Sequence, residues 1–359
     1  MGLLGLLVPA MGAVSSMSRS GSMTLTDEAL SQQLKTIFPV HTGTQGVNPF
    51  VFEALHDAIE EKCKLGELVT YSDAAAMLSM YQKASRAAET YFPGSRPGRV
   101  MADQVDEELT KHGFTPQNTL MGQSVCADEV NHVHNSFTMM MKRKWGERQE
   151  AFNLGGLAGV PFAGKTGFGA FSHHIKDNGD LLVVFAPHVG LGHTEDGTIE
   201  VGKLNRLGQS REYTVGAACG AAKGAFAHCK SGGHVMTESE LGSNALDFQM
   251  QYIIHEVNKR WKSIDSKPTE DAKQAALTYE MYKICKDFVE GIVDAEAKCY
   301  AGKHARIVVL GGIQVNMPYP MADYFQPLTF MVFEHGKPPV DLLESAFYGP
   351  KKGVNLGFK

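Results

Sequence analysis

The sequence contains few cysteines, and they are widely spaced. A disulfide-rich secreted domain needs a dense cysteine framework, so six cysteines in 359 residues exclude that class. No Cys-x-x-Cys pair is present, which disfavours a thiol redox enzyme. The pattern fits a reducing compartment in which one or two thiols are kept for chemistry. The cysteines stand at positions 63, 126, 219, 229, 285 and 299.

Long hydrophobic runs and an excess of positive charge are also missing. No apolar run approaches the ~20 residues that span a bilayer, so we expect no membrane segment. Lys and Arg total 34 against 39 Asp and Glu, and the net charge of -5 gives no bulk attraction for nucleic acid or anionic membrane. With 43% hydrophobic and 20% charged residues, the chain is globular rather than disordered.

Glycine is the residue in excess. The chain has 38 glycines among 359 residues, above the usual ~7%, and they cluster between Gly155 and Gly233. Tight turns and close backbone approaches are therefore expected there. Residues 1–26 contain no acidic residue, one Arg and many Ser and Met. This segment is either a frayed tail or a possible targeting segment.

Residues 27–115 have the pattern of a helical region. Asn48-Pro49 is a capping and first-turn signal for a helix that runs to about residue 65. Further helices are predicted over 72–92 and 99–112, separated by the Pro/Gly-rich breaker 93–98. This region carries no cluster of metal or phosphate ligands.

Residues 116–345 have the pattern of an α/β domain, followed by a C-terminal tail over 346–359. Leu181–Ala186 is a continuous apolar run, which is typical of a strand buried on both faces. The predicted fold class is therefore α/β, with a central sheet whose parallel core is covered by helices. Other strands are expected over 120–126, 199–206, 305–310 and 325–333, and helices over 128–145, 216–227, 237–262 and 269–300.

One contiguous motif suggests nucleotide binding. Gly159–Thr166 satisfies the phosphate-loop pattern G-x-x-x-x-G-K-[ST]. Such a loop needs a strand before it and a helix N-terminus after it, so that N–H groups face the phosphates. The flanking sequence predicts neither a strand before it nor a helix over Gly167–Ser172. We therefore interpret the match as accidental.

Three side chains with metal-ligand chemistry stand at predicted junctions. Cys126 and His188 each follow a predicted strand, and Cys219 lies in a small-residue helix. Functional groups of α/β proteins gather where strands end, so we expect these three to meet. Two thiolates and one imidazole suit zinc, and three protein ligands leave one coordination position for water. Of the remaining candidates, Cys229 and His228 rank lower, and Cys63, Cys285 and Cys299 are predicted core residues.

Several sequence motifs resemble those of the limiting-CO2-inducible B protein family of algae, diatoms and some bacteria. The resemblance is collinear from about residue 45 to 345. The motifs that carry the resemblance are Met121–Asn131, Gly167–His174, Phe185–Gly190, Gly202–Gln209, Ala218–Ala222 and Gly311–Asn316.

The resemblance implies a zinc carbonic anhydrase on a homodimeric, β-carbonic-anhydrase-like fold. The implied reaction interconverts CO2 and bicarbonate through a zinc-bound hydroxide. Some members of the family are active and others are silent. The alternative is therefore a catalytically silent, zinc-containing subunit that acts by association, with a second copy or with a paralogue, in a carbon-concentrating system. The resemblance also implies a chloroplast location, in the stroma or at the pyrenoid.

The sequence departs from the β-class metal-binding pattern, which runs Cys-x-Asp-x-Arg and then His-x-x-Cys. Cys126-Ala-Asp128 matches its start, but position 130 is Val, and His188 and Cys219 are 31 residues apart. The histidine ligand is therefore open between His188 and the neighbouring pair at 173 and 174. His188 is favoured because a strand end holds a ligand more rigidly than a Gly-rich loop.

The expected catalytic pair is Asp128 and an arginine. Asp128 would accept the remaining proton of the zinc-bound water, held in place by bidentate pairing with Arg206 or, as the less favoured choice, Arg211. His173 is a candidate proton shuttle. Three phenylalanines of the Gly-rich segment either line a dry pocket for an apolar gas or pack the loop, namely Phe162, Phe168 and Phe171.

Overall fold

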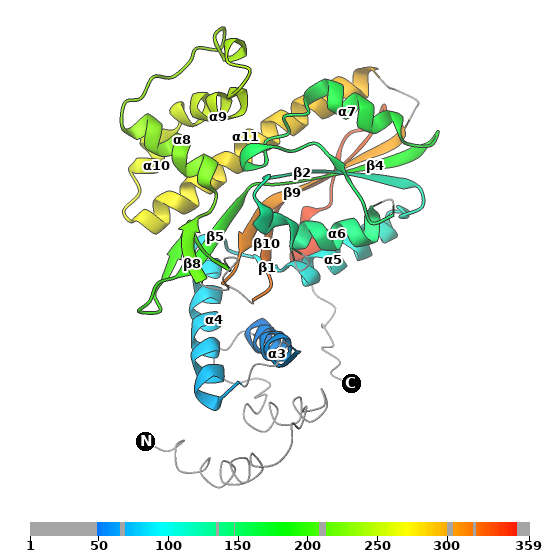
Figure 1. Cartoon of the computed structure of the whole chain (residues 1–359). Helices are drawn as coiled ribbons and strands as arrows, with labels where there is room; N and C mark the ends of the chain where they lie inside the picture. Colours follow the sequence, from blue (N-terminus) through cyan, green and yellow to red (C-terminus); the bar gives the residue numbers. More distant parts are fainter. Residues whose placement is uncertain are drawn as a thin grey trace.

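A mixed β-sheet forms the centre of the protein in this computed structural model (Figure 1). The structure describes residues 49–64, 69–133, 136–146, 148–207, 213–299, 304–318 and 321–349. The main path of the sheet runs through β1 (Arg96–Pro97), β10 (Tyr324–Glu334), β9 (His304–Asn316), β4 (Gly179–Ala186), β2 (Thr119–Val125) and β3 (Phe152–Asn153). Beside it lie β5 (His188–His193), paired with β9 and with β6 (Ile199–Val201), and β11 (Val340–Asp341), paired with β10.

The core of the sheet is parallel. Strands β2, β4 and β9 run in one direction, and β10 returns antiparallel to β9. Beyond Pro187 the chain continues along β9 as β5, so that Phe185 pairs with Gly311 and His188 with Gln314. The carboxyl ends of β2 and β4 therefore lie at one edge, where functional groups of α/β sheets collect.

Helices cover both faces of the sheet, as the apolar run Leu181–Ala186 predicted. Leu181, Val183 and Phe185 face one buried cluster, and the alternate residues of β4 face the other. On one face lie α5 (Gly98–Lys111), α6 (Phe137–Trp145) and the π-helix η4 (Glu344–Tyr348), and on the other α7 (Gly164–His173) and α11 (Glu270–Cys299) (Figure 1). The fold is a layered α/β sandwich.

The remaining elements frame this sandwich. Helix α4 (Tyr71–Tyr91) begins at a Thr70–Asp73 capping box, and its Tyr81 and C-cap residue Phe92 are buried in the same cluster as the sheet. No helix of the described residues combines the length and the apolar character that a membrane crossing needs. The other elements are α3 (Pro49–Lys64), η1 (Glu129–His132), η2 (Leu157–Gly159), β7 (Lys203–Leu207), β8 (Tyr213–Ala217), α8 (Gly220–Lys230), η3 (Leu241–Ser243), α9 (Phe248–Asn258) and α10 (Trp261–Asp265).

Glycine misled the sequence prediction in two places. The strand predicted over 305–310 continues to Asn316. The Phe185 ring fills the space beside Gly311, where a Cβ would lie 2.1 Å from it. Glycine here admits a neighbouring ring instead of ending the strand. The prediction that no helix covers Gly167–Ser172 is also wrong. Helix α7 forms there, because Phe168 and Phe171 bury against the sheet and override the low helix propensity of glycine.

Other predicted helices are shorter than expected. The predicted helix 128–145 divides into η1 and α6, and Ser136 caps the start of α6. The predicted helix 216–227 starts at Gly220, because β8 extends to Ala217. The predicted helix 237–262 begins only at α9. In contrast, α3, α4, α5, α11 and β10 lie close to their predicted bounds.

Candidate metal centre

Two thiols and one imidazole meet at the carboxyl edge of the parallel strands. Cys126 directly follows β2, His188 is the first residue of β5, and Cys219 is the N-cap of α8. Their ligand atoms all lie within 4.8 Å of one another, and all three residues are buried. The two sulfur atoms are 3.7 Å apart. Among the described residues, no other such group of His, Cys, Asp and Glu is found.

The β7–β8 hairpin brings Cys219 to this edge by crossing β5 at close range. Gly190 N–H donates to Ala218 O at 3.2 Å, and Ala218 N–H donates to Gly202 O at 3.1 Å. A Cβ at Gly190 would lie 2.2 Å from Lys203 O, which real structures do not allow. Gly190 is therefore required for the crossing, and the crossing fixes where Cys219 stands.

The two cysteines have opposite tendencies to ionise. The hydrogen bond from Cys126 lowers the pKa of Cys219, with help from the Ala221 and Ala222 N–H groups in the first turn of α8. Donating that hydrogen bond, together with burial, raises the pKa of Cys126. A metal ion binds both sulfurs as thiolates, so its binding would displace the proton that Cys126 tends to keep.

His188 completes the group with a buried nitrogen. Its Nδ1 lies 2.7 Å from Asn316 Oδ1, while Nε2 is buried and has no hydrogen-bond partner. Burial opposes the charged imidazolium, but Cys126, Asn316 and Asp128 together raise the pKa of His188 above its usual value. An unpartnered nitrogen beside two sulfurs is the donor set that suits zinc.

Asp128 stands beside this donor set. Its Oδ2 lies 3.9 Å from His188 Nε2, and its side chain is 15% exposed. Its Oδ1 accepts from Val130 N–H at 3.5 Å at the start of η1. Arg206 lies on β7, where its backbone pairs with Thr214. The Arg206 side chain and the whole of Arg211 lie outside the described part of the chain, so the pairing of Asp128 with an arginine stays a prediction.

The alternative histidines lie elsewhere. His173 and His174 are exposed at the end of α7, before β4 begins, whereas His188 follows the end of β4. The His174 ring packs edge-on against Phe152 of β3, and the group of possible metal ligands found among the described residues contains neither histidine, which argues against a direct role for His173 or His174 at the centre.

The three phenylalanines pack against other apolar side chains. Phe168 and Phe171 are fully buried beneath α7, and Phe162 meets the rings of Tyr252 and Phe288 edge-on. They pack the loop and helix, which was the plainer of the two predicted roles. Of the remaining cysteines, Cys229 and Cys285 are buried core residues, and the side chains of Cys63 and Cys299 lie outside the described part.

Sequence reasoning missed a buried polar network at the end of β9. Gln314 donates to Asn131 Oδ1 at 2.8 Å, and Asn131 in turn donates to Asp128 O at 3.3 Å. Asn316 lies two residues beyond Gln314, on the same side of the strand, and contacts Asp323 as well as His188. The signal was available, since two amides in a strand that is otherwise apolar need buried partners.

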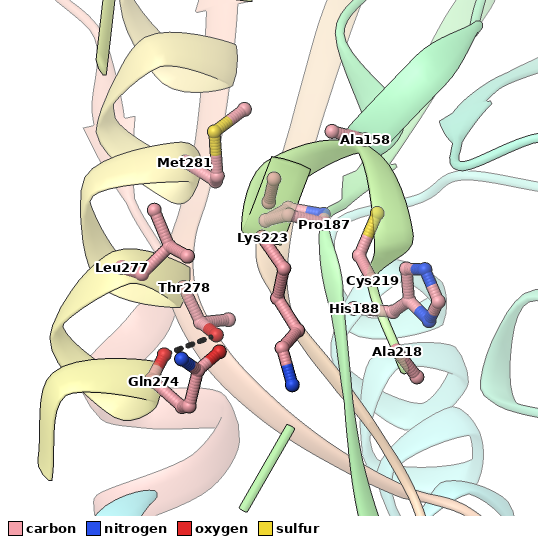
Figure 2. A pocket seen from close by; sticks show the side chains of 11 residues that line it. Ala158, Pro187, His188, Ala218, Cys219, Lys223, Gln274, Leu277, Thr278 and Met281 are labelled. Atoms are coloured by element: carbon pink, nitrogen blue, oxygen red, sulfur yellow. Dashed lines mark hydrogen bonds between the residues drawn. The ribbon is translucent and has the colours of Figure 1, made fainter. Parts of the chain in front are cut away.

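A small cavity lies behind His188 and Cys219, between α8 and α11 (Figure 2). Its volume of about 10 Å³ is close to the minimum for one water molecule. Lys223 lines it and donates to Gly202 O at 3.1 Å, and burial together with the charge of Lys203 lowers its pKa. The cavity reaches the backs of two candidate ligands and not Asp128.

Comparisons with known proteins agree with this geometry. The crystal structure of PtLCIB4, described as a homologue of the limiting CO2-inducible protein LCIB, is 28% identical, with a TM-score of 0.60 over 72% of this chain and 98% of that one. A histidine-to-alanine mutant of that protein is 27% identical over the same shares, with a TM-score of 0.61. A search of curated proteins finds no match to this sequence.

The family match covers most of the chain. The family described as limiting CO2-inducible proteins B/C beta carbonic anhydrases matches residues 97–334, a span that includes strands β2 to β10 and all three candidate ligands. A match over this share of the sequence identifies the family. The chain therefore belongs to the limiting CO2-inducible protein B/C family of beta carbonic anhydrases.

Proposed function

We propose that this protein is a zinc-dependent carbonic anhydrase that interconverts CO2 and bicarbonate. The observation that carries the proposal is the buried Cys126, His188 and Cys219 group, whose ligand atoms lie within 4.8 Å of one another. Family membership supports the same reaction. The chemistry that zinc supplies when bound is the activation of water for attack on CO2 near neutral pH.

The three ligand residues would each hold the metal from a rigid element. Cys126 and Cys219 would bind as thiolates, and His188 would bind through Nε2, the buried nitrogen that has no hydrogen-bond partner. Two thiolates cancel the double charge of zinc, so the activated water should be less acidic than at an all-imidazole site. With three protein ligands, one coordination position stays open for water.

Asp128 would act as the proton acceptor beside that open position. Its Oδ2 is near enough to His188 Nε2 to face a metal held there, at 3.9 Å in this structure. A carboxylate that accepts a hydrogen bond from the activated water would orient that water with a lone pair directed at CO2. Arg206 is the proposed partner that keeps Asp128 ionised and in place, since a bidentate guanidinium fixes a carboxylate in charge and direction.

The same short distance supports a second candidate, a catalytically silent zinc protein. If Asp128 turned by a small amount, its carboxylate would fill the open position and exclude water. The protein would then act by association, with a second copy or with a paralogue. The two candidates share their ligands and differ only in what occupies the fourth position.

One experiment separates these candidates. Zinc content and stopped-flow CO2 hydration are measured on the purified protein, before and after treatment with a chelator. Bound zinc with hydration activity that the chelator abolishes supports the enzyme. Bound zinc without hydration supports the silent subunit, and absence of zinc contradicts both.

The setting is part of the proposal. CO2 and bicarbonate are the proposed substrates, in a homodimer or a hetero-oligomer with a paralogue, and the proposed location is the chloroplast stroma or the pyrenoid. Family membership supports the substrates. Light scattering on the pure protein tests the assembly, and a fluorescent fusion of the full chain tests the location.

A further inference from the structure

A chain of buried polar groups leads from the β9–β10 connection to His188. Met317 N–H donates to Asp323 Oδ1 at 3.0 Å, and Asn316 Nδ2 donates to Asp323 Oδ2 at 2.9 Å. Asn316 Oδ1 then lies 2.7 Å from His188 Nδ1. Asp323, Asn316 and His188 are each at most 6% exposed. Solvent therefore cannot replace these contacts.

The geometry of the groups gives the direction of the bonds. Asn316 turns its NH2 group toward Asp323 Oδ2 and its oxygen toward His188, which is the arrangement that an ionised carboxylate requires because it only accepts hydrogen bonds. That oxygen is also only an acceptor, so His188 Nδ1 must carry the proton. His188 Nε2 then presents its lone pair to the two cysteine sulfurs, as a metal ligand must.

We propose that Asp323, acting through Asn316, is a positioning residue that sets the tautomer and the ring orientation of His188 for metal binding. Asn316 ends β9 and Asp323 directly precedes β10, so the two residues face each other across the connection between these strands. The inference rests on the proposed zinc site and assigns a task to two residues that do not touch the metal. Removing such a partner typically weakens metal binding 10–100-fold.

The substitution Asp323→Asn reverses the chain of bonds without changing its shape. The new amide must use its oxygen to accept Met317 N–H, so its NH2 group points at Asn316. Asn316 must then turn its oxygen away from His188 and offer an NH2 group to Nδ1 instead. This arrangement favours the tautomer protonated on Nε2, which cannot bind the metal.

A double swap restores the pattern. With Asn316→Asp and Asp323→Asn together, the amide at position 323 still accepts Met317 N–H and donates to the carboxylate at position 316. That carboxylate again accepts from His188 Nδ1. The swap therefore separates the role of this chain from a general loss of packing, because both variants keep the same number of heavy atoms.

The test measures Zn2+ affinity by competition with a chromophoric chelator and records the absorption spectrum of the Co2+-loaded protein. Asp323→Asn is expected to weaken Zn2+ binding 10–100-fold and to alter the Co2+ bands, and the double swap to restore both. Asp180→Asn is the matched control, because Asp180 is a buried carboxylate paired with Arg306 at the start of β4. It should leave Zn2+ affinity unchanged.

The inference is overturned if Asp323→Asn binds Zn2+ as the unaltered protein does, or if the double swap fails to restore binding. Should Asp323→Asn fail to fold, Asn316→Ala decides in its place, because it removes the acceptor for His188 Nδ1 and is expected to cause a similar loss. Failure of the proposed function would look different, since the unaltered protein would then bind no zinc or show no CO2 hydration.

Discussion

Two parts of this molecule carry residues that suggest a bound ligand, and they differ in burial and in their position relative to the sheet. Gly159–Thr166 forms a contiguous phosphate-loop pattern, yet Lys165 and Thr166 are exposed and the strand before them has two residues. The Cys126, His188 and Cys219 group follows no local pattern, but strand ends bring its atoms within 4.8 Å. The difference teaches that a position at the carboxyl edge of parallel strands is better evidence than a short motif.

The largest effect is expected at the candidate metal ligands. Cys126→Ser should abolish both zinc binding and CO2 hydration, because a hydroxyl is a poor replacement for a thiolate ligand. Metal analysis and stopped-flow hydration measure the two losses. Cys229→Ser, at a buried cysteine outside the group, is the control and should keep its zinc. Full zinc content in Cys126→Ser would show that the ligand set is wrong.

The second prediction separates binding from chemistry within the same group. Asp128→Ala should keep its zinc and lose about 10²–10⁴-fold in hydration rate, the usual contribution of a positioned proton acceptor. Zinc content and stopped-flow rates on one preparation check both halves. An active Asp128→Ala protein would remove Asp128 from the mechanism.

The third prediction concerns the crossing that delivers Cys219. Gly190→Ala places a methyl group 2.2 Å from Lys203 O, so the β7–β8 hairpin must move. We expect a loss of about 1–3 kcal/mol in the free energy of unfolding, together with weaker zinc binding. Denaturant melts measure the free energy of unfolding, and chelator competition measures the affinity for zinc. Gly291→Ala, on α11 with open space around it, is the control and should lose neither.

The smallest effect is expected at the phosphate-loop pattern. Lys165→Ala should change the free energy of unfolding by less than about 0.5 kcal/mol and leave hydration intact, because the side chain is exposed. ATP and GTP should give no thermal protection. A shift in melting temperature with nucleotide that Lys165→Ala removes would reverse the comparison and restore the motif as a site.

The fold could be predicted from the sequence wherever a burial pattern was long and unbroken. Leu181–Ala186 indicated a strand covered on both faces, and the structure confirms it. Glycine set the limit of this reasoning. Gly311 lies inside β9 because the Phe185 ring occupies the space of its missing side chain, a contact between distant segments that no local pattern reveals.

The candidate site was predictable in its ligand types but not in its supporting groups. Thiol and imidazole chemistry at predicted junctions selected Cys126 and Cys219, and favoured His188 over His173 and His174. The two amides of β9 indicated that Asn316 needs a buried partner, but which atoms Asn316 and Asp323 face depends on contacts between distant segments that no local pattern reveals. The partner of Asp128 stays a prediction for a different reason, because the Arg206 side chain lies outside the described part of the chain.

The sequence distance between the candidate ligands has a consequence for folding order. Cys126 and Cys219 are 93 residues apart, and His188 and Asn316 are 128 apart, so no single hairpin or helix can assemble the centre. Contacts of this kind form late, after the local elements. During synthesis or refolding, tight metal binding would then require the complete sheet, so the appearance of tight binding would mark the last step of assembly.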